Sequence, residues 1–312
     1  MPYFSVIIPL YNKESFIEKT LECVLNQTFK DFEIIIVNDG STDNGLEKIK
    51  KFTDNRIKIF QQENQGVSVA RNKGMEMAEG EYFCFLDADD EWKNDYLENL
   101  FFTIKKFPDA GMYCSRYKTK IADGKYTFCK FIDISEEYEG YIKDFFWSSF
   151  QNRIALTSAV CIYKNVFKKI GGFDKKISSG QDLDYWIRIS LKHNVVICKN
   201  TTVIYNFLQT NKSLSRSDIN KKTLPSFDQF LGDEKKNPSL KKFLDLYRIE
   251  YALHFHTFGN KEKKKFYLKE VEKENIDPKV KLLLFMPAFI LRYALYGKRY
   301  LKQFGIDFNI YH

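Results

Sequence analysis

The sequence predicts an α/β protein in which a mostly parallel, Rossmann-like sheet is flanked by helices and followed by a helical C-terminal extension. Apolar runs of strand length alternate with helical patterns through the first part of the chain. Polar residues gather where those runs end, and helical periodicity alone continues beyond about residue 220. This order is typical of a sheet that is covered on both faces and binds its ligand at the carboxyl ends of its strands.

Four strands are predicted from runs rich in β-branched and aromatic residues, at 3–11, 32–39, 56–62 and 81–87. Helical patterns fill the gaps between them, at 14–28, 44–52 and 67–78. The first of these helices carries one apolar stripe, made of Phe16, Ile17, Leu21, Val24 and Leu25. The alternation predicts βα units whose strands run in parallel.

Composition indicates a folded protein, because 44% of the 312 residues are hydrophobic and 16% are aromatic. No basic segment precedes the first apolar run, so we expect no signal peptide and a cytoplasmic chain. The six cysteines form no CxxC pair, which favours reduced core residues over a zinc site or disulfides.

Polar side chains follow three of the predicted strands and are expected to meet at one edge of the sheet. They are Asn12, Glu14, Asp39, Asp87, Asp89 and Asp90. The stretch FLDADD places three carboxylates in four positions, and such charges repel unless they are solvated, paired or neutralised. The convergence predicts a nucleotide pocket whose acidic loop has a cationic partner.

Several motifs occur in the order found in glycosyltransferase family 2, which the chain resembles from about residue 3 to residue 215. They are SVIIPLYN, IIIVNDGSTDN, NQGVSVARNKG, FLDADD, GGFD and SGQDLDYW. A lone DxD triplet is a weak signal, whereas the ordered series is specific. The resemblance implies the GT-A fold, a nucleotide-sugar donor that we expect to be UDP-linked, and Mn²⁺ or Mg²⁺ as cofactor.

The resemblance also implies roles for the acidic loop. Asp87 is expected to contact the nucleoside ribose and Asp89 to ligate the metal, which would stabilise the departing diphosphate. The small Ala88 lets the backbone lie close to the nucleotide. Asp90 either supports this shell or caps the helix expected to start near Asn94.

The resemblance places further donor contacts in the first half of the chain. Asp39 would recognise a uracil base, framed by Pro9 and Tyr11 with Tyr11 stacking on it, or would form only a turn in NDGSTD. Asn12 and Glu14 follow the first strand at the same pocket, although Glu14 is alternatively a first-turn helix acid. Arg71 resembles the family arginine near the diphosphate, and its alternative is a surface helix charge.

The acceptor side requires a base that takes the proton of the attacking hydroxyl, and Asp182 matches that role by resemblance. Family members commonly carry Glu-Asp here, whereas this chain has Gln181 before Asp182, which puts acceptor contacts in doubt. The alternative for Asp182 is a helix N-cap. Asp184 and Trp186 lie on the same predicted helix, where Trp186 lines the acceptor cleft or packs in the core.

A second departure lies in YNFLQTNKSLS, residues 205 to 215, where many relatives read Tyr-Arg-x-His. This chain has Asn206 and Leu208 instead, so a third contact to metal or diphosphate is doubtful; the replacement candidates are Gln209, Lys212 and Arg216. The QxxRW pattern of processive relatives is absent because QDLDYW has Tyr185 in place of Arg. Addition of a single sugar is therefore favoured.

The tail carries the basic charge of the chain, with 21 Lys and Arg against 12 Asp and Glu over 201–312, compared with 28 against 29 over 1–200. Its longest uncharged run, Leu282 to Leu291, contains Pro287 and is too short to span a bilayer. Basic flanks suit a helix at an anionic membrane surface. The alternative is packing on the catalytic domain or on a second subunit of a homo-oligomer, and no motif supports nucleic-acid binding.

We expect a GT-A catalytic domain over 1–218, divided near 115 into a nucleotide-sugar-binding half and an acceptor half, and a basic helical region over 219–312. The expected activity is inverting, metal-dependent transfer of one sugar to a glycan or lipid-linked acceptor in cell-surface polysaccharide synthesis, at the inner face of the membrane. The alternatives are a non-catalytic nucleotide-sugar-binding protein and a nucleotidyltransferase. Asp182 favours transfer over binding, and the lack of a Gly-rich activating loop near the N-terminus disfavours nucleotidyl transfer.

Overall fold

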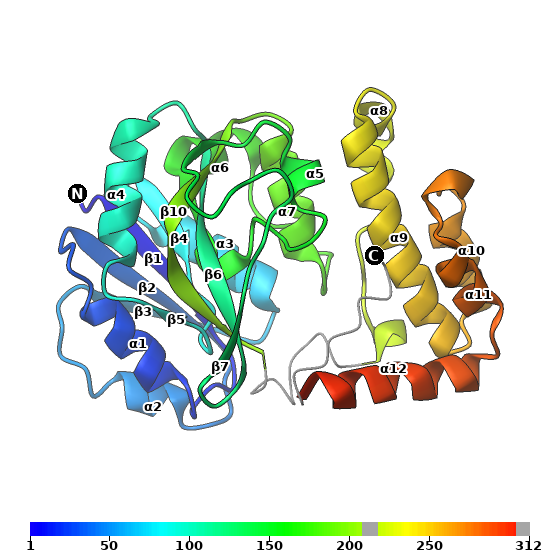
Figure 1. Ribbon diagram of the computed structural model, residues 1–312. Coiled ribbons are helices and arrows are strands. Elements are labelled where there is room, and N and C mark those ends of the chain that lie inside the picture. The colour runs from blue at the N-terminus through cyan, green and yellow to red at the C-terminus, as the bar shows by residue number, and fades with distance from the viewer. Residues whose placement is uncertain (208–217, 304–312) are drawn as a thin grey trace.

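The computed structural model of the protein describes residues 1–207 and 218–303 (Figure 1). Its strands are β1 (Phe4–Leu10), β2 (Phe32–Asp39), β3 (Ile57–Gln62), β4 (Tyr82–Phe85), β5 (Glu91–Trp92), β6 (Met112–Ala122), β7 (Lys125–Phe128), β8 (Gly140–Tyr141), β9 (Val160–Tyr163) and β10 (Val195–Asn206). Its α-helices are α1 (Ile17–Leu25), α2 (Gly45–Ile49), α3 (Val67–Met77), α4 (Tyr96–Lys106), α5 (Phe145–Ser148), α6 (Lys164–Ile170), α7 (Gln181–Ser190), α8 (Leu231–Glu234), α9 (Pro238–Thr257), α10 (Lys261–Leu268), α11 (Pro278–Phe285) and α12 (Ala288–Gln303).

One large sheet organises the first two hundred residues. Its strands lie in the order β3-β2-β1-β4-β9-β6-β10-β5, with β7 paired to β6 and β8 to β10. The strands β3, β2, β1 and β4 run in parallel, which confirms the predicted βα alternation. The short β9 runs antiparallel to both β4 and β6, so the whole sheet is mixed.

The middle of the parallel half is fully covered, as its apolar sequence requires. Every residue of β2 is buried, and β1 is buried except at Pro9. Helix α3 packs on β1 and β2, and Gly74 permits the approach because a Cβ there would lie 2.5 Å from Ile7 Cγ2. All six cysteines are free, and five of them are buried, as expected for core residues.

The C-terminal helices stand beside the sheet and share its core where they begin (Figure 1). Helix α9 starts with Pro238 after the capping residue Asn237, whose side chain accepts a hydrogen bond from the Leu240 N–H at 3.0 Å. Its Phe243 ring lies 5.6 Å from the ring of Phe146, which lies in α5 between β8 and β9. The predicted helices of the tail are confirmed, and α9 is continuous with the main apolar core.

Helices α11 and α12 pack on α9 with one face, and α12 runs across the end of α9 (Figure 1). The residues of this second apolar cluster are Ile249, Leu253, Val280, Leu284 and Leu291. The opposite face carries exposed apolar side chains, among them Phe285 at 87% and Phe289 at 64%. No helix in the described ranges combines the length and the apolar character needed to cross a membrane.

Candidate active site

The loop after β1 is fastened to the loop after β2. Asn12 adopts a left-handed backbone, with φ of 50°, and its Oδ1 accepts a hydrogen bond from the Thr42 N–H at 2.8 Å. The Glu14 N–H donates to Asp43 Oδ2 at 2.8 Å, and the Glu14 carboxylate accepts from the Asn44 N–H at 3.0 Å. Glu14 precedes α1, so the first-turn alternative for it is wrong. Asn12 and Glu14 thus brace the edge of the sheet where β1 and β2 end.

Asp39 is almost fully buried at the end of β2, and its carboxylate holds the segment that leads into α3. Oδ1 accepts from Gln62 Nε2 at 2.7 Å and from the Gln65 N–H at 2.9 Å, while Oδ2 accepts from the Gly66 N–H at 2.9 Å. The local turn is closed by Asn38 and not by Asp39. Because each carboxylate oxygen has two lone pairs, Oδ2 retains one acceptor direction for a base imide N–H.

Tyr11 follows β1 directly and leaves the sheet with a side chain that is 45% exposed. Pro9 lies within β1, opposite Val37 of β2, and is half-buried. The phenol ring is thus exposed at the end of β1, next to the strand that ends in Asp39.

Arg71 lies on α3, and its side chain contacts the acidic loop. It is 3% exposed, and its Nη2 donates to Asp87 Oδ1 at 2.5 Å. The guanidinium lies 5.3 Å from the ring centroid of Phe173. Nε and Nη1 are buried and have no hydrogen-bond partner among the described residues. The alternative of a surface helix charge is therefore wrong, because the side chain is buried and two of its donors lack a partner among the described residues.

The Asp89 carboxylate is paired with the ammonium of Lys13, which was not predicted as a site residue. Burial, together with the nearby Asp87 charge, raises the pKa of Asp89, and the Lys13 ammonium opposes this rise. Ala88, between the two acids, is buried, and its carbonyl accepts a hydrogen bond from Thr20 Oγ1 at 3.1 Å. The backbone of the acidic loop is thereby fixed against α1.

The carboxylates of the acidic loop are the side chains that could hold the expected metal. Within residues 1–207 and 218–303, no three His, Cys, Asp or Glu side chains are grouped so as to hold a metal ion. Asp87 and Asp89 offer carboxylate oxygens, which are the ligands that Mg²⁺ and Mn²⁺ prefer. The donor chemistry fits a cation that has few protein ligands, with diphosphate oxygens and water completing its shell.

Asp90 is buried and belongs to the support of the loop. Its Oδ2 accepts from Ser158 Oγ at 2.5 Å and its Oδ1 from the Asn206 N–H at 3.0 Å, while burial raises its pKa well above the usual value. Asn206 Nδ2 in turn donates to the Asp89 carbonyl at 2.6 Å. Helix α4 begins after Asp95, so the N-cap alternative for Asp90 is wrong. Asn206, a departure from the family pattern, thus anchors the acidic loop.

The remaining candidates of that segment, Leu208, Gln209, Lys212 and Arg216, lie outside the described residues.

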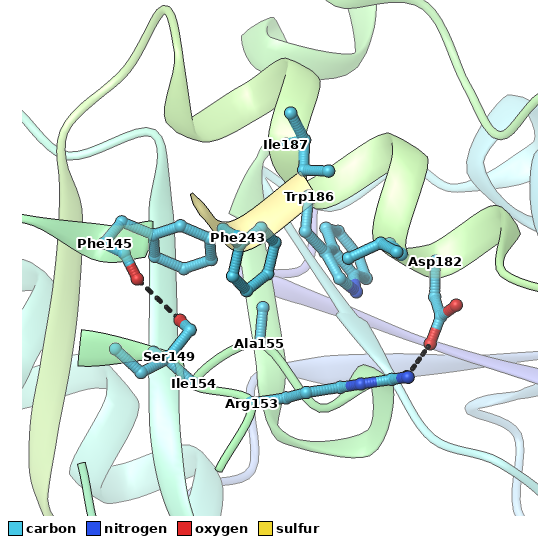
Figure 2. Close-up of a pocket in the computed structure, with 10 residues that line it drawn as sticks. Phe145, Ser149, Arg153, Ile154, Ala155, Asp182, Trp186, Ile187 and Phe243 are labelled. Carbon is cyan, nitrogen blue, oxygen red and sulfur yellow. Dashed lines mark hydrogen bonds and ion pairs between the residues drawn. The ribbon is translucent and has the colours of Figure 1, made fainter. Parts of the chain in front are cut away.

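Asp182 lies in the first turn of α7, after the left-handed N-cap residue Gly180. The N-cap alternative for Asp182 is therefore wrong. Its side chain is 24% exposed, and Oδ2 lies 3.7 Å from Arg153 Nη1 (Figure 2). Trp186, on the same helix, packs 5.6 Å from the ring of Phe85, the last residue of the strand that leads to the acidic loop. The shared core thus fixes α7 relative to that loop.

Asp184 is committed to the interior. It is 1% exposed, its Oδ2 accepts from Arg188 Nε at 2.9 Å, and its Oδ1 accepts from the Gln229 amide. Burial raises the pKa of Asp184 in spite of Arg188. The bonds to two partners leave Asp182 as the more accessible carboxylate of α7.

Two charged residues of the site were missed from the sequence, Lys13 and Arg153. Lys13 stands between Asn12 and Glu14, so its place in a loop motif was a usable signal. Arg153 lies in a stretch without a recognised motif, and its neighbour Asp182 is distant in the chain. No local pattern indicated that contact.

Comparison with known proteins gives a consistent family assignment. Residues 5–171 match the model of the family described as Glycosyl transferase family 2. The chain is 36% identical over 163 residues to the putative glycosyltransferase EpsH of Bacillus subtilis, covering 49% of this chain and 47% of that protein. It is 29% identical over 272 residues to chondroitin synthase of Pasteurella multocida, and the match covers 78% of this chain and 26% of that protein.

These matches span less than half the length of the relatives named. Among solved structures, S. aureus TarS 1-349 in complex with UDP has a TM-score of 0.62 and 20% identity, and the likeness covers 96% of this chain and 89% of that one. This similarity shows the fold, which is of the GT-A type: a central sheet flanked by helices and followed by a helical C-terminal region.

Proposed function

Because the chain belongs to glycosyltransferase family 2, we propose that it transfers one sugar from a nucleotide diphosphate sugar to an acceptor hydroxyl. The observation that carries the proposal is Arg71, which is buried with two donors unpaired beside the acidic loop. Asp87 pairs with the guanidinium charge, but the two buried N–H donors remain costly until they meet an acceptor, and an oxygen of the donor diphosphate is such an acceptor.

The donor is proposed to be UDP-linked. Tyr11 would stack on the uracil over the half-buried Pro9, and the spare lone pair of Asp39 Oδ2 would accept the imide N–H. Asp87, held by Arg71, would bind the ribose hydroxyls. The solved relative in complex with UDP supports this choice of nucleotide.

Asp89 would hold Mn²⁺ or Mg²⁺ together with the donor diphosphate. The bound ion would supply positive charge that stabilises the leaving group as the sugar bond breaks. Lys13 balances the charge of Asp89 before the donor arrives, and its side chain, 27% exposed, has room to turn toward the diphosphate. Asp90, Ser158 and Asn206 keep the loop in place during this exchange.

Asp182 would act as the general base. It would accept the proton of the acceptor hydroxyl while the oxygen attacks the anomeric carbon on the face opposite the diphosphate, so that one bond forms as the other breaks with inversion. We propose a growing or lipid-linked glycan as the acceptor, and the likeness to a chondroitin synthase supports a glycan.

A nucleotide panel tests the donor assignment. We expect UDP to raise the melting temperature of the full chain in Mn²⁺, with smaller shifts for ADP and GDP, because Asp39 and Tyr11 select a pyrimidine. Chelation of the metal should reduce the UDP shift. Equal shifts for all three nucleotides would contradict the uridine assignment, and the absence of any shift would contradict a nucleotide site.

The tail is proposed to attach the enzyme to an anionic membrane surface, leaving residues 1–218 as the catalytic part. Helices α11 and α12 expose Phe285 and Phe289 on the face that does not pack on α9. A cavity of about 650 Å³ nearby is lined by four lysines, Lys261, Lys264, Lys265 and Lys269. Lysines beside an apolar face are suited to phosphate headgroups and acyl chains.

We predict that the full chain sediments with anionic vesicles and is partly released by high salt. Phe289→Ser should weaken binding at least about tenfold, because burial of one Phe side chain contributes roughly 1.5–3 kcal/mol. Phe102→Ser on α4 is the matched control, since both side chains are 64% exposed. Equal effects of the two changes, or no binding of the parent chain at low salt, would remove the membrane proposal.

A further inference from the structure

Arg153 is placed to contact whatever approaches Asp182. Its backbone is held by Tyr117, whose hydroxyl donates to the Arg153 carbonyl at 3.0 Å. Its guanidinium lies 5.2 Å from the ring centroid of Tyr247 on α9, and the side chain is 48% exposed. The 3.7 Å distance to Asp182 Oδ2 is longer than a hydrogen bond, so the guanidinium, which also bonds to the Tyr247 hydroxyl, keeps further N–H donors for a ligand.

Trp186 supplies a second donor at the same place. The residue is 2% exposed, and its indole N–H has no hydrogen-bond partner among the described residues. In Figure 2 the ring nitrogen lies on the edge of the indole that faces Arg153 and Asp182. The indole N–H groups of the other two tryptophans have partners. That of Trp92 donates to the Ser158 carbonyl at 2.7 Å, and that of Trp147 donates to Asp133 Oδ2 at 2.8 Å. A buried donor without a partner indicates that a ligand atom completes it.

The crevice between these donors is narrow and otherwise apolar. Its free volume is about 10 Å³, and Phe145, Ala155, Ile187 and Phe243 contribute to its walls (Figure 2). That space holds a single small atom and not a sugar ring. The crevice therefore has room for one oxygen of a ligand between Arg153 and Trp186, and not for the ligand's ring. Apolar walls strengthen any charge interaction made there.

We propose that Arg153 and Trp186 form a subsite for an anionic group, phosphate or carboxylate, carried by the acceptor close to its reacting hydroxyl. The inference rests on the proposed function of Asp182 as base. A guanidinium pairs with such anions through two parallel hydrogen bonds, and the indole N–H adds a third. The acceptor class is accordingly an acidic glycan, in which the anion sets the hydroxyl beside Asp182.

The indole N–H signals of the three tryptophans provide a direct readout. The full chain is ¹⁵N-labelled and saturated with UDP and Mg²⁺, so that the diphosphate site is filled, and Trp186→Phe assigns its signal. Inorganic phosphate, glucuronate and glucose are then titrated at constant ionic strength. We expect phosphate or glucuronate to shift the Trp186 signal and glucose to leave it unchanged, with the Trp92 and Trp147 signals constant throughout. The anion that shifts it at lower concentration identifies the source of the charge.

Arg153→Gln should raise the half-saturating anion concentration at least tenfold. Arg56→Gln is the control, because it removes the same charge from a partly exposed arginine that is likewise paired with an aspartate, Asp54, before β3. A Trp186 signal that ignores both anions, responds equally to glucose, or responds equally in Arg153→Gln and Arg56→Gln would overturn the subsite. Loss of UDP binding would instead contradict the proposed function, and the melting temperature reports that separately.

Discussion

Asp182→Asn is expected to lower the rate of sugar transfer by roughly 10² or more, the usual contribution of a positioned general base. Asn has nearly the same shape, and within the described residues the Asp182 side chain makes only its long ion pair with Arg153. The fold and the donor site should therefore remain intact. Steady-state release of UDP measures the rate, and UDP titration measures donor affinity.

Asp174→Asn is the control for this change. Asp174 is exposed and precedes α7, and its Oδ1 accepts a hydrogen bond from the Lys176 N–H at 2.8 Å, so we expect near-parental rates. Transfer at the parental rate by Asp182→Asn would move the base elsewhere. Asp184 is the next carboxylate on the helix, although its bonds to Arg188 and Gln229 would first have to break.

Asp89→Asn is expected to abolish transfer and to weaken UDP binding strongly in Mn²⁺ while changing it little in chelator. The side chain loses the charge that would hold the ion, and the diphosphate then lacks its neutralising partner. The same change frees the Lys13 ammonium to turn toward the diphosphate, which keeps UDP binding in chelator at least as strong as in the parent. Calorimetric titration with UDP under both conditions measures the difference.

Asp123→Asn serves as the matched control for the metal series, because this aspartate is exposed in the turn between β6 and β7 and pairs with Lys120 at 2.9 Å. Its UDP affinity should equal that of the parent with and without Mn²⁺. Equal affinities of the Asp89→Asn variant and the parent in Mn²⁺ would contradict the metal assignment and leave Lys13 and Arg71 as the cations of the site.

Much of the donor half could be predicted because its information is local. Apolar runs such as FEIIIVND identify buried strands, and the parallel order then brings their polar ends to one edge. The place of β9 could not be predicted in this way. VCIY is a short apolar run, and nothing within it indicates that it enters the sheet antiparallel between β4 and β6.

The alternatives that the sequence left open for Asp90 and Arg71 depend on residues distant in the chain. Asp90 resembles a capping acid when its local sequence is considered, yet its partners Ser158 and Asn206 lie far along the chain. Arg71 has the helical position of a surface charge, and burial by the segment around Phe173 decides otherwise. Periodicity likewise predicted α9 without showing that Phe243 packs on α5. Tertiary contacts supplied the missing information in each case.

The stereochemistry of the product tests the central claim most directly. The full chain is incubated with Mn²⁺, an acidic glycan acceptor and each member of a set of UDP-linked α-sugars, and the product is followed by ¹H NMR. Direct displacement assisted by Asp182 predicts one UDP for each sugar transferred and a new linkage that is β from its first appearance. An α-linked product, or firm binding of the donor with no release of UDP, would contradict an inverting glycosyltransferase.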